Sequence, residues 1–410
     1  MITSPFALPS AFDATTLGHY ADVLVWGLER GRGAPFHKSD FILVRYDLAA
    51  LPLAEEVCSR LHDHGVVPIP RMLPTPRMEH DFYTKANNRR LTLIPPGERD
   101  LYNHLNGSIS LLAPASLSHL ASVEPERIAL AQQARRPLQE IARVREQMKA
   151  FGWTLCMWPT PALAGWAEMS EEDYATEIAR ACHLFSGDPV ATWKRIARDA
   201  EALRTELDAL GNATLHVEAD DGTDLRLSIG ASRRWAGITG RNIPSFELYV
   251  SPDWRTVDGV YHADLPSFRS GNVVQGVRLT FRDGRATQLQ AQRGEGFATG
   301  QLNMDPGAAL VGEFALVDKR FSPIGRFMAN TLYDENHGGP NGSMHIALGQ
   351  SYANTYAGDA AAFTEEERTR LGFNASGLHW DLISTSNRRV TALLPGGTRK
   401  VIYEDGSFTL

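Results

Sequence analysis

The stretch Leu378-His379-Trp380-Asp381-Leu382-Ile383 carries a histidine and a carboxylate two positions apart within an apolar run. Side chains two apart on a β-strand point to the same face, so the imidazole of His379 and the carboxylate of Asp381 are predicted to converge. Both groups are common ligands of divalent metals in proteins. The stretch therefore predicts an apolar strand that carries part of a metal site.

Side chains of the same kinds recur through the last third of the chain and just before it. A second strand-like run begins at His345, and the remaining candidates are Glu247, Glu313, Glu335 and Tyr352. A single histidine in a strand is more often packed or exposed than a ligand, but several buried carboxylates are costly unless they are paired or bind a metal. The spacing alone leaves a metal site and a purely structural set of residues both open.

Length and composition indicate a two-domain globular protein that acts on a small or peptide partner. A chain of 410 residues exceeds what one hydrophobic core usually serves. The net charge of -7 gives no basic surface for nucleic acid, and no apolar run approaches the roughly 20 residues of a membrane span. The cysteines form no disulfide or thiolate-zinc pattern, and the first residues lack a secretory signal. We therefore expect a cytoplasmic protein whose metal ligands are oxygen and nitrogen atoms.

The first half of the sequence alternates between strand-like and helix-like segments, as in an open α/β sheet. Pro137 should end or kink the longer of the predicted helices. No glycine-rich phosphate loop follows a predicted strand, which disfavours nucleotide binding. The pattern predicts strands over 41–46, 66–69, 91–94, 108–112 and 153–158 and helices over 53–64 and 125–151.

After Gly211 the sequence changes to short alternating strands divided by turns. The dipeptides Asp283-Gly284 and Asp405-Gly406 are typical of tight β-hairpins. We therefore predict an α+β protein of two domains. An N-terminal open α/β-sheet domain covers residues 1–188, and a C-terminal, mostly antiparallel and β-barrel-like catalytic domain covers residues 189–410.

Several segments of the second half also occur in an order that belongs to a known family. They are Gly222-Thr223-Asp224-Leu225, the segment 244–250 with Glu247, Gly312 to Val317, Thr331 to Asn336, His345 to Gly349 with Tyr352 beyond it, and His379-Trp380-Asp381. Pro159-Thr160-Pro161-Ala162 extends the similarity upstream, although it is much weaker in the first 150 residues. With these segments the chain resembles the aminopeptidase T and aminopeptidase S family of metallopeptidases.

The resemblance implies a cytoplasmic, homodimeric exopeptidase that holds two divalent ions in its C-terminal domain and cleaves peptides with a free N-terminus. Tyr352 matches a tyrosine of the family's active site. Matched position by position, the implied metal ligands are Glu247, Glu313, Glu335, His345, His379 and Asp381.

One departure from the family concerns the spacing of two ligands. In the family the glutamate stands close before the histidine, whereas here the glycine-rich segment 336–344 separates Glu335 from His345. The longer loop puts the reach of Glu335 in question. It also offers His337, either as an additional ligand or as an exposed loop residue.

The residue types agree with metal-assisted hydrolysis. Two metals roughly 3.5–4 Å apart can share a bridging carboxylate, activate water and polarise the scissile carbonyl. Carboxylates and imidazoles suit zinc, cobalt or manganese without choosing among them. Tyr352 would donate a hydrogen bond to the oxyanion, and Glu247 is the first carboxylate to test as general base if it does not bind metal.

Two other functions remain open from the sequence. A relative on the same scaffold would bind one iron through His345, His379 and Asp381 and act as a ring-cleaving dioxygenase. Glu313 and Glu335 argue against this function, because a single iron leaves both without a role. An inactive peptide-binding relative is the other alternative, and the complete ligand set argues against it.

Overall fold

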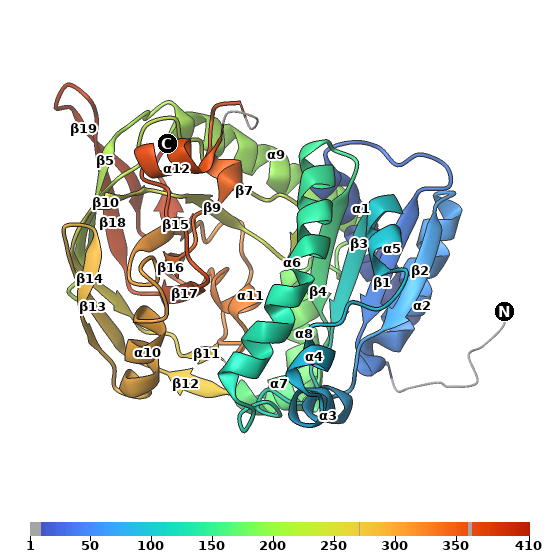
Figure 1. The fold of residues 1–410 in the computed structure, drawn as a ribbon. Coiled ribbons are helices and arrows are strands. Elements are labelled where there is room, and N and C mark those ends of the chain that lie inside the picture. Colours follow the sequence, from blue (N-terminus) through green and yellow to red (C-terminus); the bar gives the residue numbers. More distant parts are fainter. Residues whose placement is uncertain (1–9, 270, 360–362) are drawn as a thin grey trace. The chain divides into compact units, whose positions relative to one another are not determined.

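The computed structural model describes residues 10–269, 271–359 and 363–410. It divides into two compact units, drawn from blue to red along the chain in Figure 1. Unit 1 ends at Trp193 and also includes Thr239–Pro244, and unit 2 comprises Lys194–Ile238 and Ser245–Leu410. The division falls within helix α9 (Pro189–Asp208), and the domain boundary between residues 188 and 189 stays a prediction. No helix of the described ranges is long and apolar enough to cross a membrane.

Unit 1 is built on a parallel sheet in the strand order β2-β1-β3-β4-β8. The central strands are largely buried, as expected for parallel strands covered on both faces. The N-terminal open α/β sheet predicted from the sequence is therefore confirmed. The strands are β1 (Phe41–Tyr46), β2 (Val67–Met72), β3 (Leu105–Leu112), β4 (Gly152–Met157) and β8 (Asn242–Ile243).

The helices of unit 1 form two groups. Helix α1 contacts β3 and β4, and α2 contacts β1 and β2 as well as α1, whereas α6 contacts α4 and α5. Helix α1 starts where the Asp13 carboxylate accepts a hydrogen bond of 2.7 Å from the Thr16 amide. The helices are α1 (Ala14–Arg32), η1 (Leu48–Ala50), α2 (Leu51–Asp63), α3 (Pro76–Lys85), α4 (Asn88–Leu91), α5 (Glu98–His104), α6 (Pro125–Gln147), α7 (Pro161–Trp166) and α8 (Glu171–Ala181).

One detail of unit 1 differs from the prediction, and another is tested only in part. The predicted strand over 91–94 is wrong, because the side chain of Asn87 caps the short helix α4 by accepting from the Arg90 amide, and the chain after Leu91 is irregular. Pro137 lies inside α6, so this helix does not end at the proline, and a kink there stays a prediction.

Unit 2 consists mainly of antiparallel sheets. An eight-stranded sheet has the order β14-β13-β10-β6-β5-β18-β19-β20, a five-stranded sheet has the order β17-β16-β15-β9-β7, and β11 pairs with β12. The antiparallel character is as predicted, and a barrel-like closure stays a prediction. The strands are β5 (Thr214–Ala219), β6 (Asp224–Ser228), β7 (Ala236–Gly237), β9 (Glu247–Val250), β10 (Asp253–Ala263), β11 (Ser267–Arg269), β12 (Asn272–Val274), β13 (Val277–Arg282), β14 (Arg285–Gln290), β15 (Val311–Val317), β16 (Ser343–Gly349), β17 (His379–Ser384), β18 (Arg388–Leu393), β19 (Arg399–Glu404) and β20 (Ser407–Phe408).

Both predicted hairpin turns of unit 2 are present. Asp283 and Gly284 join β13 to β14 with φ values of 49° and 80°, and Asp405 and Gly406 join β19 to β20 with 47° and 76°. Positive φ at both positions is the requirement of a type I′ turn, whose twist matches that of the strands. The short helices of unit 2 are α10 (Glu295–Leu302), α11 (Thr331–Asp334), η2 (Ala353–Thr355) and α12 (Glu365–Arg370).

Candidate metal centre

The register of the five-stranded sheet brings the candidate ligands to one face. Residues paired across antiparallel strands share a face, as do residues two apart on one strand. His345 pairs with Ala315, and Asp381 pairs with Ala347. Three further residues follow the same alternation and lie on this face. Glu313 pairs with Ala347, His379 pairs with Gly349, and Glu247 pairs with Val317. Four neighbouring strands therefore present five potential ligands on the same face.

A β-bulge at Gly312 lies directly before Glu313. The register between β15 and β16 shifts by one residue between Val311 and Glu313, whereas Glu313 keeps the alternation of Ala315 and Val317. A Cβ atom on Gly312 would lie 2.3 Å from the carbonyl oxygen of Gly349. Only glycine therefore fits the close approach of the two strands at this point.

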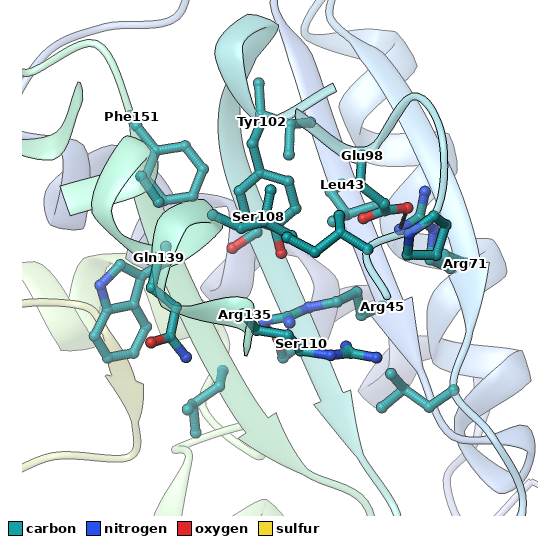
Figure 2. A pocket seen from close by; sticks show the side chains of 18 of the residues that line it. Leu43, Arg45, Arg71, Glu98, Tyr102, Ser108, Ser110, Arg135, Gln139 and Phe151 are labelled. Carbon is teal, nitrogen blue, oxygen red and sulfur yellow. Dashed lines mark hydrogen bonds and ion pairs between the residues drawn. The ribbon is translucent and has the colours of Figure 1, made fainter. Parts of the chain in front are cut away.

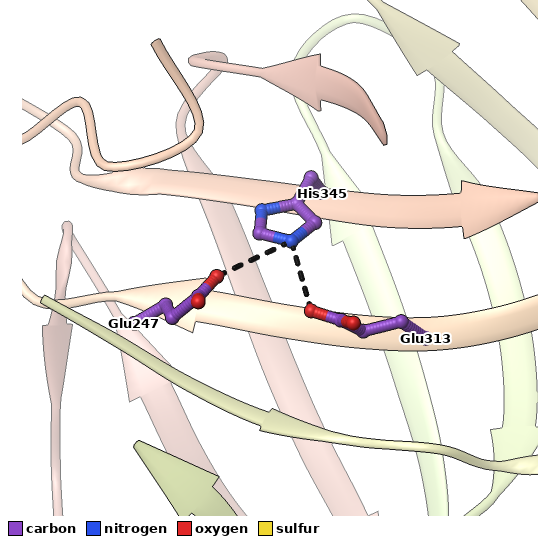
Figure 3. A group of neighbouring side chains, drawn as sticks. All are labelled: Glu247, Glu313 and His345. Carbon is purple, nitrogen blue, oxygen red and sulfur yellow. Dashed lines mark hydrogen bonds and ion pairs between the residues drawn. The ribbon is translucent and has the colours of Figure 1, made fainter. Parts of the chain in front are cut away.

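The centre of the cluster is His345, shown with two glutamates in Figure 3. Its Nε2 atom lies 3.2 Å from Oε1 of Glu313 and 3.5 Å from Oε2 of Glu247. All three residues are buried, and one ligand atom from each lies within 4.8 Å of the others. This is the spacing that a shared cation requires.

His379 and Asp381 extend the cluster along β17. Nε2 of His379 lies 3.3 Å from Oδ1 of Asp381 and 3.8 Å from Oε2 of Glu313. The same nitrogen lies 3.2 Å from the hydroxyl of Tyr352, while Nδ1 lies 3.1 Å from the carbonyl oxygen of Gln350. Since a carbonyl can only accept, Nδ1 carries the proton and Nε2 is the atom left to bind a metal.

Glu335, which precedes the long loop, is buried and feels the charges of the cluster. It is buried at the C-terminal end of α11, and the charges of Glu247, Asp381 and Glu313 all act on it. The next residue, Asn336, accepts a hydrogen bond from the Phe246 amide and donates to the Leu332 carbonyl at 3.0 Å. Asn336 therefore anchors the chain before the loop leaves.

Burial and mutual repulsion strongly shift the pKa values of the carboxylates. Burial, with the charge of Glu313, raises the pKa of Glu247 to about 8. Burial and the neighbouring carboxylates also raise the pKa of Glu335 well above its ordinary value. For Asp381, burial acts upward, but the adjacent imidazolium of His379 outweighs it and lowers the pKa to about 2.

The same negative charges raise the pKa values of the two histidines and the tyrosine. Burial acts to lower the pKa of His345, but the hydrogen bond to Glu313 and the nearby carboxylates raise it to about 9. For His379, burial is likewise outweighed by Asp381, and the pKa rises to about 9. The pKa of Tyr352 lies well above its usual range because its hydroxyl is withdrawn from water beside carboxylates, although 40% of the residue surface is exposed.

The cluster fits divalent cations on its donor chemistry. Its carboxylate oxygens and imidazole nitrogens are the ligands that zinc, cobalt and manganese accept. Burying several negatively charged carboxylates together is costly without compensating positive charge. In addition, Oε2 of Glu313 is buried without a hydrogen-bond partner. A cation would satisfy both the excess charge and the orphaned oxygen.

The structure also identifies neighbours that the sequence did not. Arg269 on β11 donates to the His379 carbonyl oxygen at 2.9 Å. Burial lowers the pKa of Arg269, and the charge of Asp381 acts in the opposite direction. A single arginine in a short strand carries no signal in the sequence.

His337, the additional candidate, is not among the clustered ligands of the described ranges.

Replacing Gly312 with alanine should damage this centre. The new methyl group cannot fit beside Gly349, so β15 and β16 must separate where Glu313 is held. We expect the free energy of unfolding to fall by about 1–3 kcal/mol, as for an overpacked site, and metal affinity to fall with it. Melting temperature and metal titration check this result. Gly325→Ala is the matched control, since nothing lies within 4 Å of the added atom; equal behaviour of the two variants would contradict the role of the bulge.

Comparison with known proteins agrees with this geometry. A protein family described as thermophilic metalloprotease (M29) matches residues 13–408. Aminopeptidase PepS of Streptococcus thermophilus is 31% identical over 313 residues, which cover 70% of this chain and 73% of that protein. Aminopeptidase T of Thermus aquaticus is 30% identical over 312 residues, covering 71% and 74%.

A solved structure extends the comparison to the fold. Wild-type AmpT from Thermus thermophilus superposes with a TM-score of 0.78 over 96% of this chain and 99% of that chain. The sequence identity over this superposition is 23%. The similarity therefore covers both units described above, including the first 150 residues, where the sequence motifs were weakest.

Proposed function

This chain belongs to the thermophilic metalloprotease family M29 and is a metalloaminopeptidase, and from this premise we propose how its own residues perform the hydrolysis. The proposed ligands of two divalent cations are Glu247, Glu313, Glu335, His345, His379 and Asp381. The observation that supports this set is the convergence of five of them on one sheet face, together with the burial of Glu335, whose pKa the neighbouring carboxylates raise.

The charge of the cluster supports two cations rather than one. Glu247, Glu313, Glu335 and Asp381 contribute four negative charges when ionised, and imidazoles are neutral when they bind a metal. Two divalent cations balance these four charges, whereas one would leave two buried carboxylates uncompensated. We propose zinc, cobalt or manganese as the metals, because all three accept this donor set.

The remaining residues are proposed to orient and stabilise the reacting groups. When bound, divalent cations supply Lewis acidity that polarises a peptide carbonyl and makes water a stronger nucleophile. Tyr352 is proposed to donate its hydroxyl hydrogen to the carbonyl oxygen as negative charge develops there. The Gln350 carbonyl keeps the proton of His379 on Nδ1, so that Nε2 stays available to a cation.

Glu247 is the first carboxylate to test as general base if it does not bind metal. Its carboxylate lies at the start of β9 with a pKa raised to about 8 by burial and by Glu313. If Glu247 is not a ligand, we propose it as the general base. We also propose a metal ion or a carboxylate of the cluster as the anchor for the free α-amine of the peptide.

Metal analysis with matched substrates tests the proposal. We expect two divalent ions per folded chain. We also expect an N-acetylated peptide to be cleaved about 10–100-fold more slowly than its free counterpart, because its charge-assisted contact is lost. One ion per chain would contradict the proposed pair of cations. Equal turnover of the two peptides would contradict recognition of a free N-terminus.

The family resemblance also supports a proposal about assembly and location. We propose that the protein works as a homodimer in the cytoplasm. Sedimentation of the purified chain at micromolar concentration should give twice the monomer mass of 45.2 kDa. A monomer with full activity would contradict the proposed assembly.

A further inference from the structure

A row of polar side chains crosses one face of the parallel sheet in unit 1. Arg71 on β2 pairs with Arg45 on β1, which pairs with Ser110 on β3. The next row contains Ser108, opposite Leu43. Strands of a parallel sheet are normally apolar on both faces, because helices cover them. Polar residues on its two central strands therefore need a reason other than packing.

This row lies where open α/β sheets bind ligands. The strand order β2-β1-β3-β4 reverses direction between β1 and β3, and ligands of such sheets bind near the carboxyl ends of the strands at this switch point. Arg45 is the last residue but one of β1, and Ser110 lies in the carboxyl-terminal half of β3. The polar row thus coincides with the topological position expected for a binding site.

A pocket opens over the row, with strand residues on one side and α6 on the other (Figure 2). Its volume of about 780 Å³ is within the usual range for a small-molecule site. Part of its lining is apolar, since Leu43, Leu105 and Phe151 form a buried cluster against which Tyr102 and Trp153 pack. Every lining residue belongs to unit 1, whereas all the proposed metal ligands belong to unit 2.

The pocket has a surplus of positive charge. Arg45 donates from Nη2 to the Ser110 hydroxyl at 2.8 Å, and its buried Nε atom has no hydrogen-bond partner. Neither Arg45 nor Arg135 of α6 forms an ion pair within the described ranges. The other charged lining residues are already paired: Arg71 with Glu98, Arg143 with Glu140, and Glu146 with Arg241.

We propose that this pocket is a second binding site that takes a small organic anion. A carboxylate or phosphate group of the ligand binds the guanidinium groups of Arg45 and Arg135 and the hydroxyl of Ser110. The apolar part of the ligand packs on Leu43 and Phe151. Charge and shape thus select an anion with an aromatic or branched body over an inorganic ion.

Calorimetric titration of the metal-loaded, full-length protein tests the proposal. The probes are phenylacetate, phenyl phosphate, inorganic phosphate and the neutral analogue benzyl alcohol. We expect at least one aryl anion to bind with a Kd of about 1 mM or tighter. Benzyl alcohol and inorganic phosphate should each bind at least about tenfold more weakly. Benzyl alcohol lacks the anionic group, and inorganic phosphate lacks the aromatic body. A preference between the two aryl anions identifies the head group.

Variants attribute the binding to this pocket. Arg45→Met and Arg135→Met should each weaken the binding of the aryl anion by about tenfold or more. Arg135 is exposed on α6, so its variant stays informative if Arg45→Met folds poorly. Arg99→Met, which removes an exposed arginine outside the pocket, should bind as the wild type does.

Three results would overturn the proposal. The first is the absence of aryl-anion binding, and the second is unchanged affinity in both Arg45→Met and Arg135→Met. The third is loss of binding in His379→Ala, which would assign the anion to the metal centre of unit 2 instead.

Discussion

An alanine in place of His379 is expected to lower peptidase activity and bound metal together, each by more than about 10²-fold under limiting metal. The physical reason is that Nε2 of His379 is a proposed ligand, and even the loss of a residue that only orients a ligand costs about 10–100-fold in affinity or activity. The melting temperature should fall as well, because metal binding contributes to the stability of the folded chain. Metal content, melting temperature and kcat measure the three effects.

A histidine elsewhere in unit 2 provides the control for this variant. His216 lies on β5 in the eight-stranded sheet, where its Nε2 is 2.8 Å from Asp224. His216→Ala should keep its metal and its activity per folded molecule. If His379→Ala lowered only the melting temperature and left metal content and kcat intact, His379 would be a packing residue and not a ligand.

Phenylalanine at position 352 should separate catalysis from metal binding. Tyr352→Phe keeps the ring that packs against His379 and removes only the hydroxyl. Losing one donor to a developing oxyanion typically costs about 10²–10³-fold in kcat. Because the hydroxyl is not a proposed ligand, metal content should equal that of the wild type.

Tyr356→Phe is the matched control for the loss of a tyrosine hydroxyl. Tyr356 stacks on Phe363 with ring centroids 4.2 Å apart and packs in a hydrophobic cluster with Leu371 and Phe373. The kcat of the Tyr356→Phe variant should therefore remain at the wild-type value. An unchanged kcat in Tyr352→Phe would remove Tyr352 from the catalytic residues, and reduced metal content would make it a ligand or a support of one.

The sequence predicted the local features of the site better than its assembly. The alternation of His379 and Asp381 depends only on the geometry of one strand, and the hairpin at Asp283 and Gly284 depends on two adjacent residues. The pairing of β9 with β15 joins segments far apart in the chain. No local pattern specifies such a pairing, so the approach of Glu247 to His345 required the structure.

The errors have physical causes of the same kind. Leu91 to Ile94 has the composition of a strand, but the Asn87 cap and the two prolines at 95 and 96 favour a short helix followed by loop. The question about the reach of Glu335 is of another kind, since it rests on counting residues in the loop. The Asn336 anchor, which fixes Glu335 before the loop begins, cannot be deduced from that count.

The arrangement of the proposed ligands on one face also limits how the length of this chain can change over evolution. Inserting or deleting residues between Asn336 and Met344 lengthens or shortens a loop, and the entropic cost of closing a loop grows only slowly with its length. A single deletion inside β16 or β17 would instead move every following side chain to the opposite face. Homologous chains can therefore differ in length before His345, whereas the spacing of two between His379 and Asp381 must stay fixed.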